Sequence, residues 1–411
     1  MQIAVLGYGV VGSGVVELFE KHKQGIISKS TQNNLDLKYI LEIRDCTDSP
    51  YSPLFTKDFN DILNDDGVKI VVETMGGLHP AYDYVKASLH AGKHVVSSNK
   101  ELVATFGYEL LKLADKNNVN FLFEASVGGG IPIIRPISQC LAANEINEIA
   151  GILNGTTNFI LTKMFGESMS FKDALLLAQE NGYAERDPSA DIDGIDSCRK
   201  ICILASLCFG SHVFPKDTFT EGISSIKSED VEYAKSWGGA IKLIAKAKKL
   251  ENGKIHILVS PALVQNHSQI AHVDDVFNAI LVRGDAIGEV VFYGRGAGKM
   301  PTASAVLADI IDCAKHDLRK KLFGWGAPVD DYVEDYMDMP VSLYVRAQIG
   351  DFLSALAHVE DVITGVTILK RKDAPGDELA FVTPPEKEGL LRQKLEKLPL
   401  NPLSIIRVTD Y

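Results

Sequence analysis

The stretch that decides the fold is IAVLGYGVVGSGVVELF, residues 3–19. It has the pattern of a buried strand, a glycine-rich turn and the start of a helix, with Gly7, Gly9 and Gly12 in the spacing G-x-G-x-x-G. In that context the first glycine permits a tight turn, the second lets the backbone approach a pyrophosphate, and the third lets the helix pack closely on the strand. The sequence therefore predicts a dinucleotide-binding loop.

Two features near this loop bear on which dinucleotide it binds. The helix begins at Val10 and Val11, where unpaired N–H groups and the positive end of the helix dipole favour a phosphate. The second strand is expected to end at Ile43, and Arg44 and Asp45 follow it. Arg44 would suit the 2′-phosphate of NADP, whereas Asp45 would suit the 2′-hydroxyl of NAD. These two neighbours leave both cofactors open.

Outward from the loop, the first third of the chain alternates strand-like and helix-like segments. Short apolar runs are expected to form strands at residues 3–6, 37–43, 69–73, 94–97 and 120–123. Helical patterns lie between several of them, at residues 10–23, 80–91 and 107–117. Apolar strands in alternation with helices predict an α/β domain with a Rossmann-type, doubly wound parallel sheet.

The pattern changes after about residue 145. Residues 237–250 alternate apolar and polar positions, and the pairs Asn252-Gly253 and Gly284-Asp285 predict two hairpins. This region is therefore expected to be α+β, with an antiparallel sheet of the kind that often has one face open to a partner subunit. Residues 341–411 have the order strand, helix, strand, strand, helix, strand of a small ferredoxin-like unit.

Composition argues against several classes of function. The 411 residues carry a formal net charge of −12, and nucleic acid is not expected as a partner because phosphate backbones are bound by basic patches. None of the six cysteines belongs to a C-x-x-C pair, so reduced thiols in a cytoplasmic protein are expected. No run reaches the ~18 apolar residues of a membrane span, so no membrane is expected as a partner.

The segment AERDPSADIDGIDSCRK, residues 184–200, gathers five carboxylates and ends in a lysine. A calcium loop of the EF-hand type is excluded, because Lys200 would occupy the position of the bidentate glutamate. Residues 201–209 are apolar nearly all round and predict a buried helix, with Lys200 near its rim and Asp196 one turn earlier on the same face. A partly desolvated lysine beside a carboxylate suits proton transfer, and a solvated charge run is the alternative.

Six blocks of sequence together resemble the homoserine dehydrogenases. In chain order they are LGYGVVGSG (6–14), SSNKELVA (97–104), EASVGGGIPII (124–134), GILNGTTNFIL (151–161), GYAERDPSADIDGIDSCRK (182–200) and GRGAGKMPTASAV (294–306). The C-terminal unit resembles an ACT domain, and the chain is similar to the monofunctional form of the family. The resemblance implies a dinucleotide-binding domain at 1–135 plus 297–318, a substrate and dimerisation domain at 136–296, a linker at 319–340 and an ACT-like domain at 341–411.

The resemblance implies NAD(P)-dependent interconversion of L-homoserine and L-aspartate 4-semialdehyde, a step towards threonine, methionine and isoleucine. Lys200 matches the lysine that handles the proton, and Lys100 matches a second lysine suited to the substrate carboxylate or to catalysis. The matching substrate-binding positions are Glu185, Asp191, Asp196, Gly155 and Thr156. The matching cofactor positions are Gly7, Gly9, Val10, Val11, Gly12, Arg44, Lys100 and Gly298.

The resemblance also implies a structural monovalent cation, Na⁺ or K⁺. Its ligands would be one side chain and several backbone carbonyls, at Glu124, Val127, Gly129 and Ile131. The family further implies a homodimer or homotetramer. A regulatory amino acid at the ACT-like unit is one role open to that unit, and a structural or dimerising role is the other.

The chain departs from the family pattern in two places. NADP-using members often carry basic residues just after the position of Arg44, and here the residues 46–50 read CTDSP. Ligand loops of ACT domains often contain Pro-Gly after an acid, and here residues 348–351 read QIGD. The first departure weakens an assignment to NADP, and the second weakens the binding of a regulatory amino acid.

Two other functions fit parts of the sequence. An aspartate-semialdehyde dehydrogenase has a similar cofactor domain but needs a nucleophilic cysteine, and Cys198 and Cys202 lie on a helix that is expected to be buried. A cofactor-binding sensor that signals through its ACT-like unit would need no catalytic side chains. The residues Lys100, Glu185, Asp196 and Lys200 speak against such a loss of activity.

Overall fold

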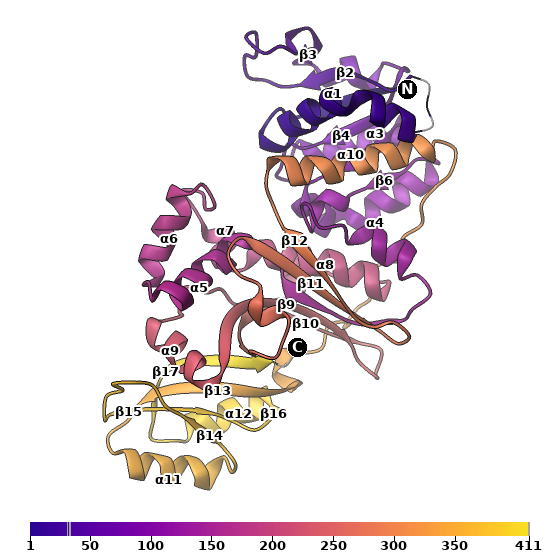
Figure 1. Cartoon of the computed structure of the whole chain (residues 1–411). Helices are drawn as coiled ribbons and strands as arrows, with labels where there is room; N and C mark the ends of the chain where they lie inside the picture. Colours follow the sequence, from indigo (N-terminus) through magenta and orange to yellow (C-terminus); the bar gives the residue numbers. More distant parts are fainter. Residues whose placement is uncertain (31, 33, 410–411) are drawn as a thin grey trace.

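The computed structural model describes residues 1–30, 32 and 34–409. Two positions of the predicted dinucleotide domain, 31 and 33, and the last two of the predicted C-terminal unit lie outside the described residues. Figure 1 shows an N-terminal α/β part, a central part built on long strands, and a C-terminal part drawn in yellow. No helix among the described residues combines the length and the apolar character needed to cross a bilayer.

The N-terminal part contains the predicted parallel sheet. Its strands are β1 (Gln2–Leu6), β2 (Asp36–Leu41), β3 (Phe55–Thr56), β4 (Val68–Glu73), β5 (His94–Ser97) and β6 (Phe121–Leu122). They lie in the order β3-β2-β1-β4-β5-β6, and all neighbours are parallel. This is the strand order of dinucleotide-binding folds, so the predicted fold class is confirmed. The short β3 was not predicted.

Helices cover both faces of this sheet, as the apolar strands require. They are α1 (Val10–Ser30), α2 (Phe59–Leu63), α3 (Ala81–His90), α4 (Lys100–Lys116) and, far later in the chain, α10 (Lys299–Lys315). Helix α10, drawn in orange, lies beside α1 in Figure 1. Together they bury one face of the sheet in a core that includes Val16, Phe19 and Ile310.

The central part is an antiparallel sheet with helices on one side. Its strands β7 (Ile146–Ile152), β9 (Gly239–Lys249), β10 (Ile255–Gln265), β11 (Phe277–Gly284) and β12 (Gly288–Arg295) lie in the order β12-β11-β7-β9-β10. Both predicted hairpins are present. The helices are α5 (Gly155–Glu167), α6 (Phe171–Glu180), α7 (Ser189–Ile192), α8 (Ile195–Phe209) and α9 (Ser228–Trp237), and the short β8 (Phe219–Thr220) pairs with β10.

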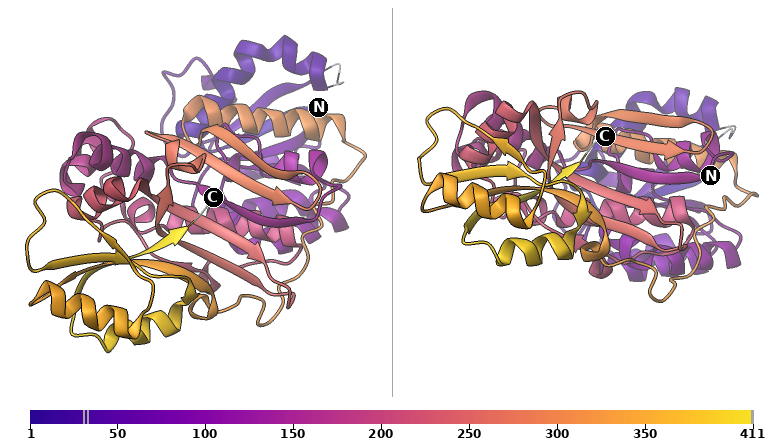
Figure 2. Two further views of the ribbon diagram at one scale, coloured as in Figure 1. Left: turned by 60° about the horizontal axis from the view of Figure 1, so that its bottom comes forward. Right: turned by 90° about the horizontal axis from the view of Figure 1, so that it is seen from below.

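The C-terminal part has its elements in the expected order. They are β13 (Pro340–Gln348), α11 (Phe352–Val362), β14 (Thr367–Leu369), β15 (Glu378–Val382), the short β16 (Glu386–Lys387), α12 (Glu388–Glu396) and β17 (Asn401–Thr409). Strand β14 is shorter than expected, because α11 continues to Val362. Strand β17 also pairs in parallel with β10, so this sheet continues the central one, as the views in Figure 2 show.

Buried ion pairs fasten the C-terminal part to helix α9. The guanidinium of Arg346 binds Asp230 at 2.8 Å and Glu378 at 3.1 Å, and all three residues are buried. Arg371 binds the same Glu378 at 3.0 Å. Segment 319–340, predicted to be a linker, is also attached to the central part. Its Trp325 donates a hydrogen bond from Nε1 to Nδ1 of His212 at 3.1 Å.

Candidate active site

Two helices bring charged side chains together where the N-terminal and central parts meet. Lys100 begins α4, and both Asp196 and Lys200 lie on α8. The Lys200 Nζ donates to Asp196 Oδ2 and to the carbonyl of Leu153, both at 2.7 Å. The Lys100 Nζ binds the other oxygen of Asp196 at 2.5 Å. One carboxylate is therefore shared by two lysines that come from different parts of the fold.

The sequence of α8 explains why this cluster is buried. The helix is apolar on nearly every side, so it lies inside the core and carries Lys200 with it, leaving 6% of that residue exposed. Asp196 lies one turn earlier and is 4% exposed. The helix begins after Gly194 and ends at Gly210, both with φ near +80°, a left-handed conformation that glycine adopts without strain. The predicted pairing of Lys200 and Asp196 on one helical face is present in the structure.

The two lysines titrate differently because their surroundings differ. Burial lowers the pKa of Lys200, and the attraction of Asp196 offsets only part of that effect. For Lys100 the attraction of Asp196 dominates and raises the pKa; its side chain is 40% exposed, against 8% for Lys200. Burial works to raise the pKa of Asp196, but the two ammonium groups outweigh it and hold that pKa well below its usual range. Lys200 is thus the lysine that gives up its proton more readily.

Asn154 connects this cluster to helix α5 and was not singled out from the sequence. Its Nδ2 donates to Asp191 at 2.7 Å and to Asp196 at 2.9 Å. Its Oδ1 accepts from the backbone N–H of Thr157 at 2.8 Å and so caps α5. Burial, followed by repulsion from Asp196, raises the pKa of Asp191. An Asn before a helix is a cap signal, but the partners on α7 and α8 lie far away in sequence.

The remaining predicted substrate residues lie around the start of α5. Gly155 is its first residue, and a Cβ there would stand 2.8 Å from the carbonyl oxygen of Val276. Thr156 donates from Oγ1 to the carbonyl of Tyr183 at 2.7 Å, which attaches the loop that carries Glu185. Glu185 itself is exposed, and within the described residues its carboxylate does not join the network of Asp196. The structure therefore brings Asp191, Asp196 and Lys200 together but leaves Glu185 at the surface.

The predicted dinucleotide loop has the geometry that its glycines require. Gly7 has φ +92°, and a Cβ on Gly12 would stand only 2.0 Å from the carbonyl oxygen of Gly7. A Cβ on Gly9 would meet nothing within 4 Å, so the space beside it is open for a phosphate. Val10 and Val11 begin α1, whose first N–H groups have no partner inside the helix. Gly298, with φ +118°, precedes α10. These residues fit a dinucleotide.

An acid at the end of β2 was missed in the sequence. The strand ends at Leu41, two residues earlier than predicted, so Glu42 takes the position of the ribose-binding acid. Its carboxylate accepts from the N–H of Tyr8 at 3.1 Å and from the guanidinium of Arg44 at 2.7 Å. The Arg44 hydrogen bond is the main reason that the pKa of Glu42 falls to about 2. Asp45, by contrast, accepts only from the N–H of Thr47 in its own turn, as far as the described residues go.

A second group of polar residues lies at the ends of β4 and β5. The buried carboxylate of Glu73 accepts from the N–H groups of Met75 and Gly76 and from the hydroxyl of Ser97, the last at 2.6 Å. Ser97 accepts in turn from the N–H of Asn99 at 3.0 Å, and Asn99 caps α4. This set, the Glu73 ring, joins the loop after β4 to the helix that Lys100 begins. Nothing in the sequence near Glu73 identifies it.

The loop predicted to hold a cation fits such an ion. The carboxylate of Glu124 accepts from the N–H groups of residues 133–135 at 2.6–2.9 Å, which leaves one of its roughly four acceptor positions. Within the described residues, the carbonyls of Val127, Gly129 and Ile131 accept no hydrogen bond. Hard cations prefer oxygen ligands of these two kinds. The described residues contain no cluster of three or more His, Cys, Asp or Glu suited to a metal.

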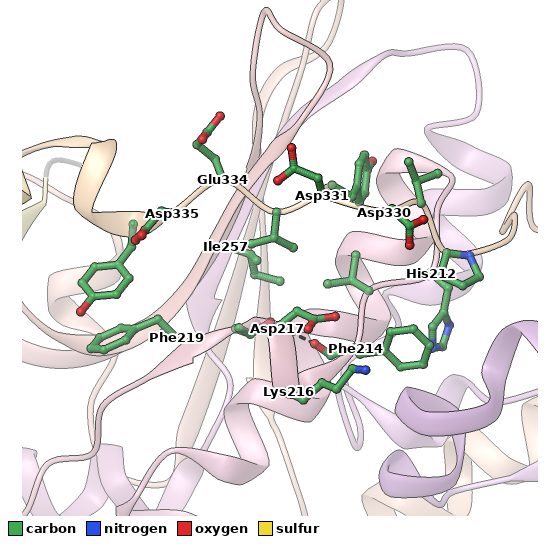
Figure 3. A pocket seen from close by; sticks show the side chains of 17 residues that line it. His212, Phe214, Lys216, Asp217, Phe219, Ile257, Asp330, Asp331, Glu334 and Asp335 are labelled. Carbon is green, nitrogen blue, oxygen red and sulfur yellow. Dashed lines mark hydrogen bonds between the residues drawn. The ribbon is translucent and has the colours of Figure 1, made fainter.

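A cavity of about 760 Å³ lies elsewhere, between segments 212–219 and 328–336 (Figure 3). Neither Lys100 nor Lys200 lines it. Several carboxylates surround it, and His212 is 4% exposed with no hydrogen-bond partner at Nε2 among the described residues. The His212 ring packs edge to face with Phe214, with centroids 4.3 Å apart, and burial lowers its pKa to about 4. The His212 ring is therefore neutral at pH 7, and the cavity is separate from the Asp196 cluster.

The fold and this cluster define a class of protein. A parallel sheet with a dinucleotide loop supplies the site for a nicotinamide cofactor, and a lysine with a lowered pKa beside it can move the proton that accompanies a hydride. The class is that of the nicotinamide-dependent oxidoreductases.

Comparisons with known proteins narrow this class. Residues 132–311 match the family model for homoserine dehydrogenase, and residues 7–124 match that for the homoserine dehydrogenase NAD binding domain. The homoserine dehydrogenase of Bacillus subtilis is 37% identical over 93% of this chain and 90% of its own length. That of Synechocystis is 42% identical over 76% and 73%. The chain belongs to the homoserine dehydrogenase family and is an oxidoreductase.

Solved structures agree with this assignment. The crystal structure of a homoserine dehydrogenase from Thiobacillus denitrificans has a TM-score of 0.91 and 33% identity, covering 100% of this chain and 98% of that one. An archaeal homoserine dehydrogenase in complex with NADPH has a TM-score of 0.63 and 29% identity, covering 76% and 97%. The cofactor of this family is a nicotinamide dinucleotide, NAD or NADP.

Proposed function

We propose that the chain interconverts L-homoserine and L-aspartate 4-semialdehyde with Lys200 as the proton carrier. The observation that carries this proposal is the carboxylate of Asp196 held between Lys100 and Lys200 at 2.5 and 2.7 Å. The test is an assay of homoserine with NAD and with NADP, followed through the absorbance of the reduced nicotinamide. Reduction of either cofactor that depends on homoserine supports the proposal, and no reduction with either would overturn it.

The proton step follows from the charges of the cluster. A bound nicotinamide supplies a hydride acceptor for the carbon that bears the hydroxyl group. Lys200, once neutral, takes the hydroxyl proton on Nζ as the C–H and O–H bonds break and the carbonyl forms. Lys100 remains an ammonium, since Asp196 raises its pKa. The reverse reaction returns the same proton to the aldehyde oxygen.

The substrate would bind through charged groups around this cluster. Asp191 and Asp196 suit the amino and hydroxyl groups, and Glu185 would reach the amino group if its loop moves inward. Gly155 and Thr156 begin α5 and offer the closing loop. Lys100 suits the substrate carboxylate, because its partly exposed ammonium stays charged.

We further propose that NAD is preferred over NADP. Glu42 lies where the ribose hydroxyl would donate to a carboxylate. A 2′-phosphate would meet that negative charge, and Arg44 could reach the phosphate only by leaving Glu42, to which it is bound at 2.7 Å. Lys57 follows β3, which pairs with the end of β2, and so lies near Glu42. Its positive charge would favour the 2′-phosphate of NADP.

A monovalent cation, Na⁺ or K⁺, is proposed at Glu124, Val127, Gly129 and Ile131. This loop packs against the segment that returns from β12 to α10: Gly130 N–H donates to the carbonyl of Arg295 at 3.0 Å. A cation there would stiffen the junction and take no part in the chemistry, because an alkali ion polarises poorly. Activity and thermal stability measured with and without added K⁺ or Na⁺ test the proposal.

A cytoplasmic location is also proposed, because the six free cysteines suit a compartment in which thiols stay reduced. A homodimer or homotetramer is proposed, with light scattering as the test. A regulatory amino acid is proposed at the loop before α11, where Asp351 accepts from Ser354 N–H at 2.8 Å and caps the helix. Titration with threonine under assay conditions tests that role.

Aspartate-semialdehyde dehydrogenase chemistry finds no support here. Cys198 is 4% exposed and its thiol lies 3.6 Å from the carbonyl of Pro215. A hydrogen bond with Cys202 lowers the pKa of Cys198 to about 7, but this thiol contacts Cys202 and Pro215 and does not face the Asp196 cluster. The comparisons point to homoserine dehydrogenases throughout.

A further inference from the structure

Asn278 is a buried amide whose oxygen lacks a hydrogen-bond partner among the described residues. It is the second residue of β11 and is 2% exposed. Burying an unpaired amide is costly, so such groups usually have a partner that protein atoms alone do not supply. The position of this amide indicates what the partner is.

The register of the sheet places Asn278 next to the proton-carrying lysine. Ala279 pairs with Ile152 across β11 and β7, so Asn278 lies opposite Leu153, one step further along. The carbonyl of Leu153 accepts the hydrogen bond from Lys200 at 2.7 Å. Ile280, on the same face of β11, belongs to the core that includes residues of α8. The amide therefore lies on the catalytic face of the sheet.

Two glycines lie close to the amide. A Cβ on Gly296 would stand 1.9 Å from Asn278 Nδ2, and a Cβ on Gly155 would stand 3.6 Å from Oδ1. Gly296 begins the segment that returns to α10, where Lys299 lies within 3 Å of the Cβ position of Gly14 in α1. Asn278 thus bridges the segment beside the dinucleotide loop and the start of the substrate helix α5.

We infer that the side chain of Asn278 binds the carboxamide of the nicotinamide ring when the cofactor enters. This inference rests on the proposed function. A primary amide offers a donor and an acceptor, and the carboxamide offers the complementary pair. The amino acid substrate instead carries an ammonium and a carboxylate, for which the chain already supplies Asp191, Asp196 and Lys100. A neutral amide between the two segments suits the neutral end of the cofactor.

The test compares NAD with 3-acetylpyridine adenine dinucleotide, in which a methyl group replaces the carboxamide NH₂. The ratio for the two cofactors is measured both as Kd, by isothermal titration calorimetry without homoserine, and as kcat/KM with homoserine saturating, in the wild type, Asn278→Ala and Asn278→Leu. The analogue's intrinsic reactivity cancels between proteins, and the ratio does not depend on how much protein is folded. The preference for NAD is expected to shrink about three- to tenfold in both variants, as loss of a hydrogen bond predicts.

Asn120→Ala is the matched control, because Asn120 is an equally buried amide (3% exposed) that binds residues around His316, away from α8. It should lower the thermal midpoint and leave the cofactor ratio unchanged. An unchanged ratio in the Asn278 variants, with homoserine oxidation retained, overturns the inference. A raised KM for homoserine with an unchanged ratio assigns the amide to the substrate and also overturns it. Failure of the wild type to oxidise homoserine would instead overturn the proposed function.

Discussion

The carboxylate of Asp196 holds two ammonium groups, and this sharing determines how the site ionises. Three coupled charges carry a net +1, and loss of one proton leaves a neutral set. Because Lys200 is buried and Lys100 is partly exposed, the proton leaves from Lys200. The spacing of Asp196 and Lys200 predicts that they share one face of a helix. The presence of Lys100 in the same site was expected only from the resemblance to the family, because Lys100 lies on a different helix.

Replacement of Lys200 by alanine should lower turnover by about 10²–10⁴, the range for loss of a general acid or base. The Kd for the cofactor should change little, because in the described part of the chain Lys200 donates only to Asp196 and to the carbonyl of Leu153. Stopped-flow turnover and fluorescence titration of the reduced cofactor measure the two effects. Lys21→Ala, an exposed lysine on α1, is the control. A Lys200→Ala enzyme with full activity would remove this residue from the mechanism.

The pH dependence follows from the lowered pKa of Lys200. Oxidation of homoserine needs the neutral amine, so kcat/KM should rise with pH and reach a plateau. The apparent pKa should lie below the ~10.4 of an unperturbed lysine. In Asp196→Asn the carboxylate that favours the ammonium is gone, so the rise should shift to lower pH in whatever activity remains. A shift to higher pH would contradict the assigned charges.

Cofactor preference should depend on a single acid at the end of β2. We expect wild-type kcat/KM to favour NAD over NADP by about tenfold or more, the effect of one charged hydrogen bond. Glu42→Ala should narrow that ratio, and Asp45→Ala should leave it unchanged, since Asp45 caps only its own turn. A wild type that prefers NADP would show that Arg44 leaves Glu42 for the phosphate. The sequence could not indicate Glu42, because the end of β2 was misplaced by two residues.

At the scale of elements, the hydrogen-bonded Glu73 ring fixes where α4 begins. Asn99 caps the helix, so α4 starts at Lys100 rather than at residue 107 as its apolar pattern suggested. The cap was readable in principle from Asn99, but its link to Glu73 runs through Ser97 on another strand. Strand and helix types were predictable because apolar periodicity is local, whereas boundaries depended on such distant partners.

Loss of the Ser97 hydroxyl should disturb both Lys100 and the loop after β4. In Ser97→Ala we expect kcat to fall about tenfold and KM for the cofactor to rise, since small displacements of positioned groups are costly. Ser88→Ala is the matched control, because Ser88 is equally buried and its hydroxyl has no partner among the described residues. Steady-state kinetics of both variants measure these constants, and thermal melts measure their stability. Equal kinetic constants in the two variants would show that the Glu73 ring does not position Lys100 or the loop after β4.

At the scale of the whole molecule, one sheet runs from β12 to β14 through the pairing of β10 with β17. These regions were expected to be separate units because each has its own local sequence pattern. The parallel pairing of two strands so far apart in the chain has no local signal, and neither has the attachment of segment 319–340 through Trp325. The buried ion pairs between α9 and the C-terminal part likewise have no local signal in the sequence.

Those ion pairs should contribute strongly to stability. Arg346→Ala leaves the buried Asp230 without its ion-pair partner and leaves Glu378 with Arg371 alone, so we expect the free energy of unfolding to fall by about 3–5 kcal/mol. Lys387→Ala, which breaks the exposed pair with Asp338, should cost about 0–1 kcal/mol. Urea unfolding measures both. A loss in Arg346→Ala no larger than in the control would mean that water or rearrangement replaces the arginine.

The late arrival of α10 has a consequence for biosynthesis. Val16 and Phe19 on α1 share a core with Ile310 on α10, so one face of the N-terminal sheet is only partly covered until α10 leaves the ribosome. At 5–20 residues per second, translation of the intervening segment 123–298 takes roughly nine to thirty-five seconds. During that interval the nascent chain exposes an apolar surface to the cell. Chaperones that bind such surfaces should crosslink to α1 in ribosome-bound chains halted before α10 and release those halted after it.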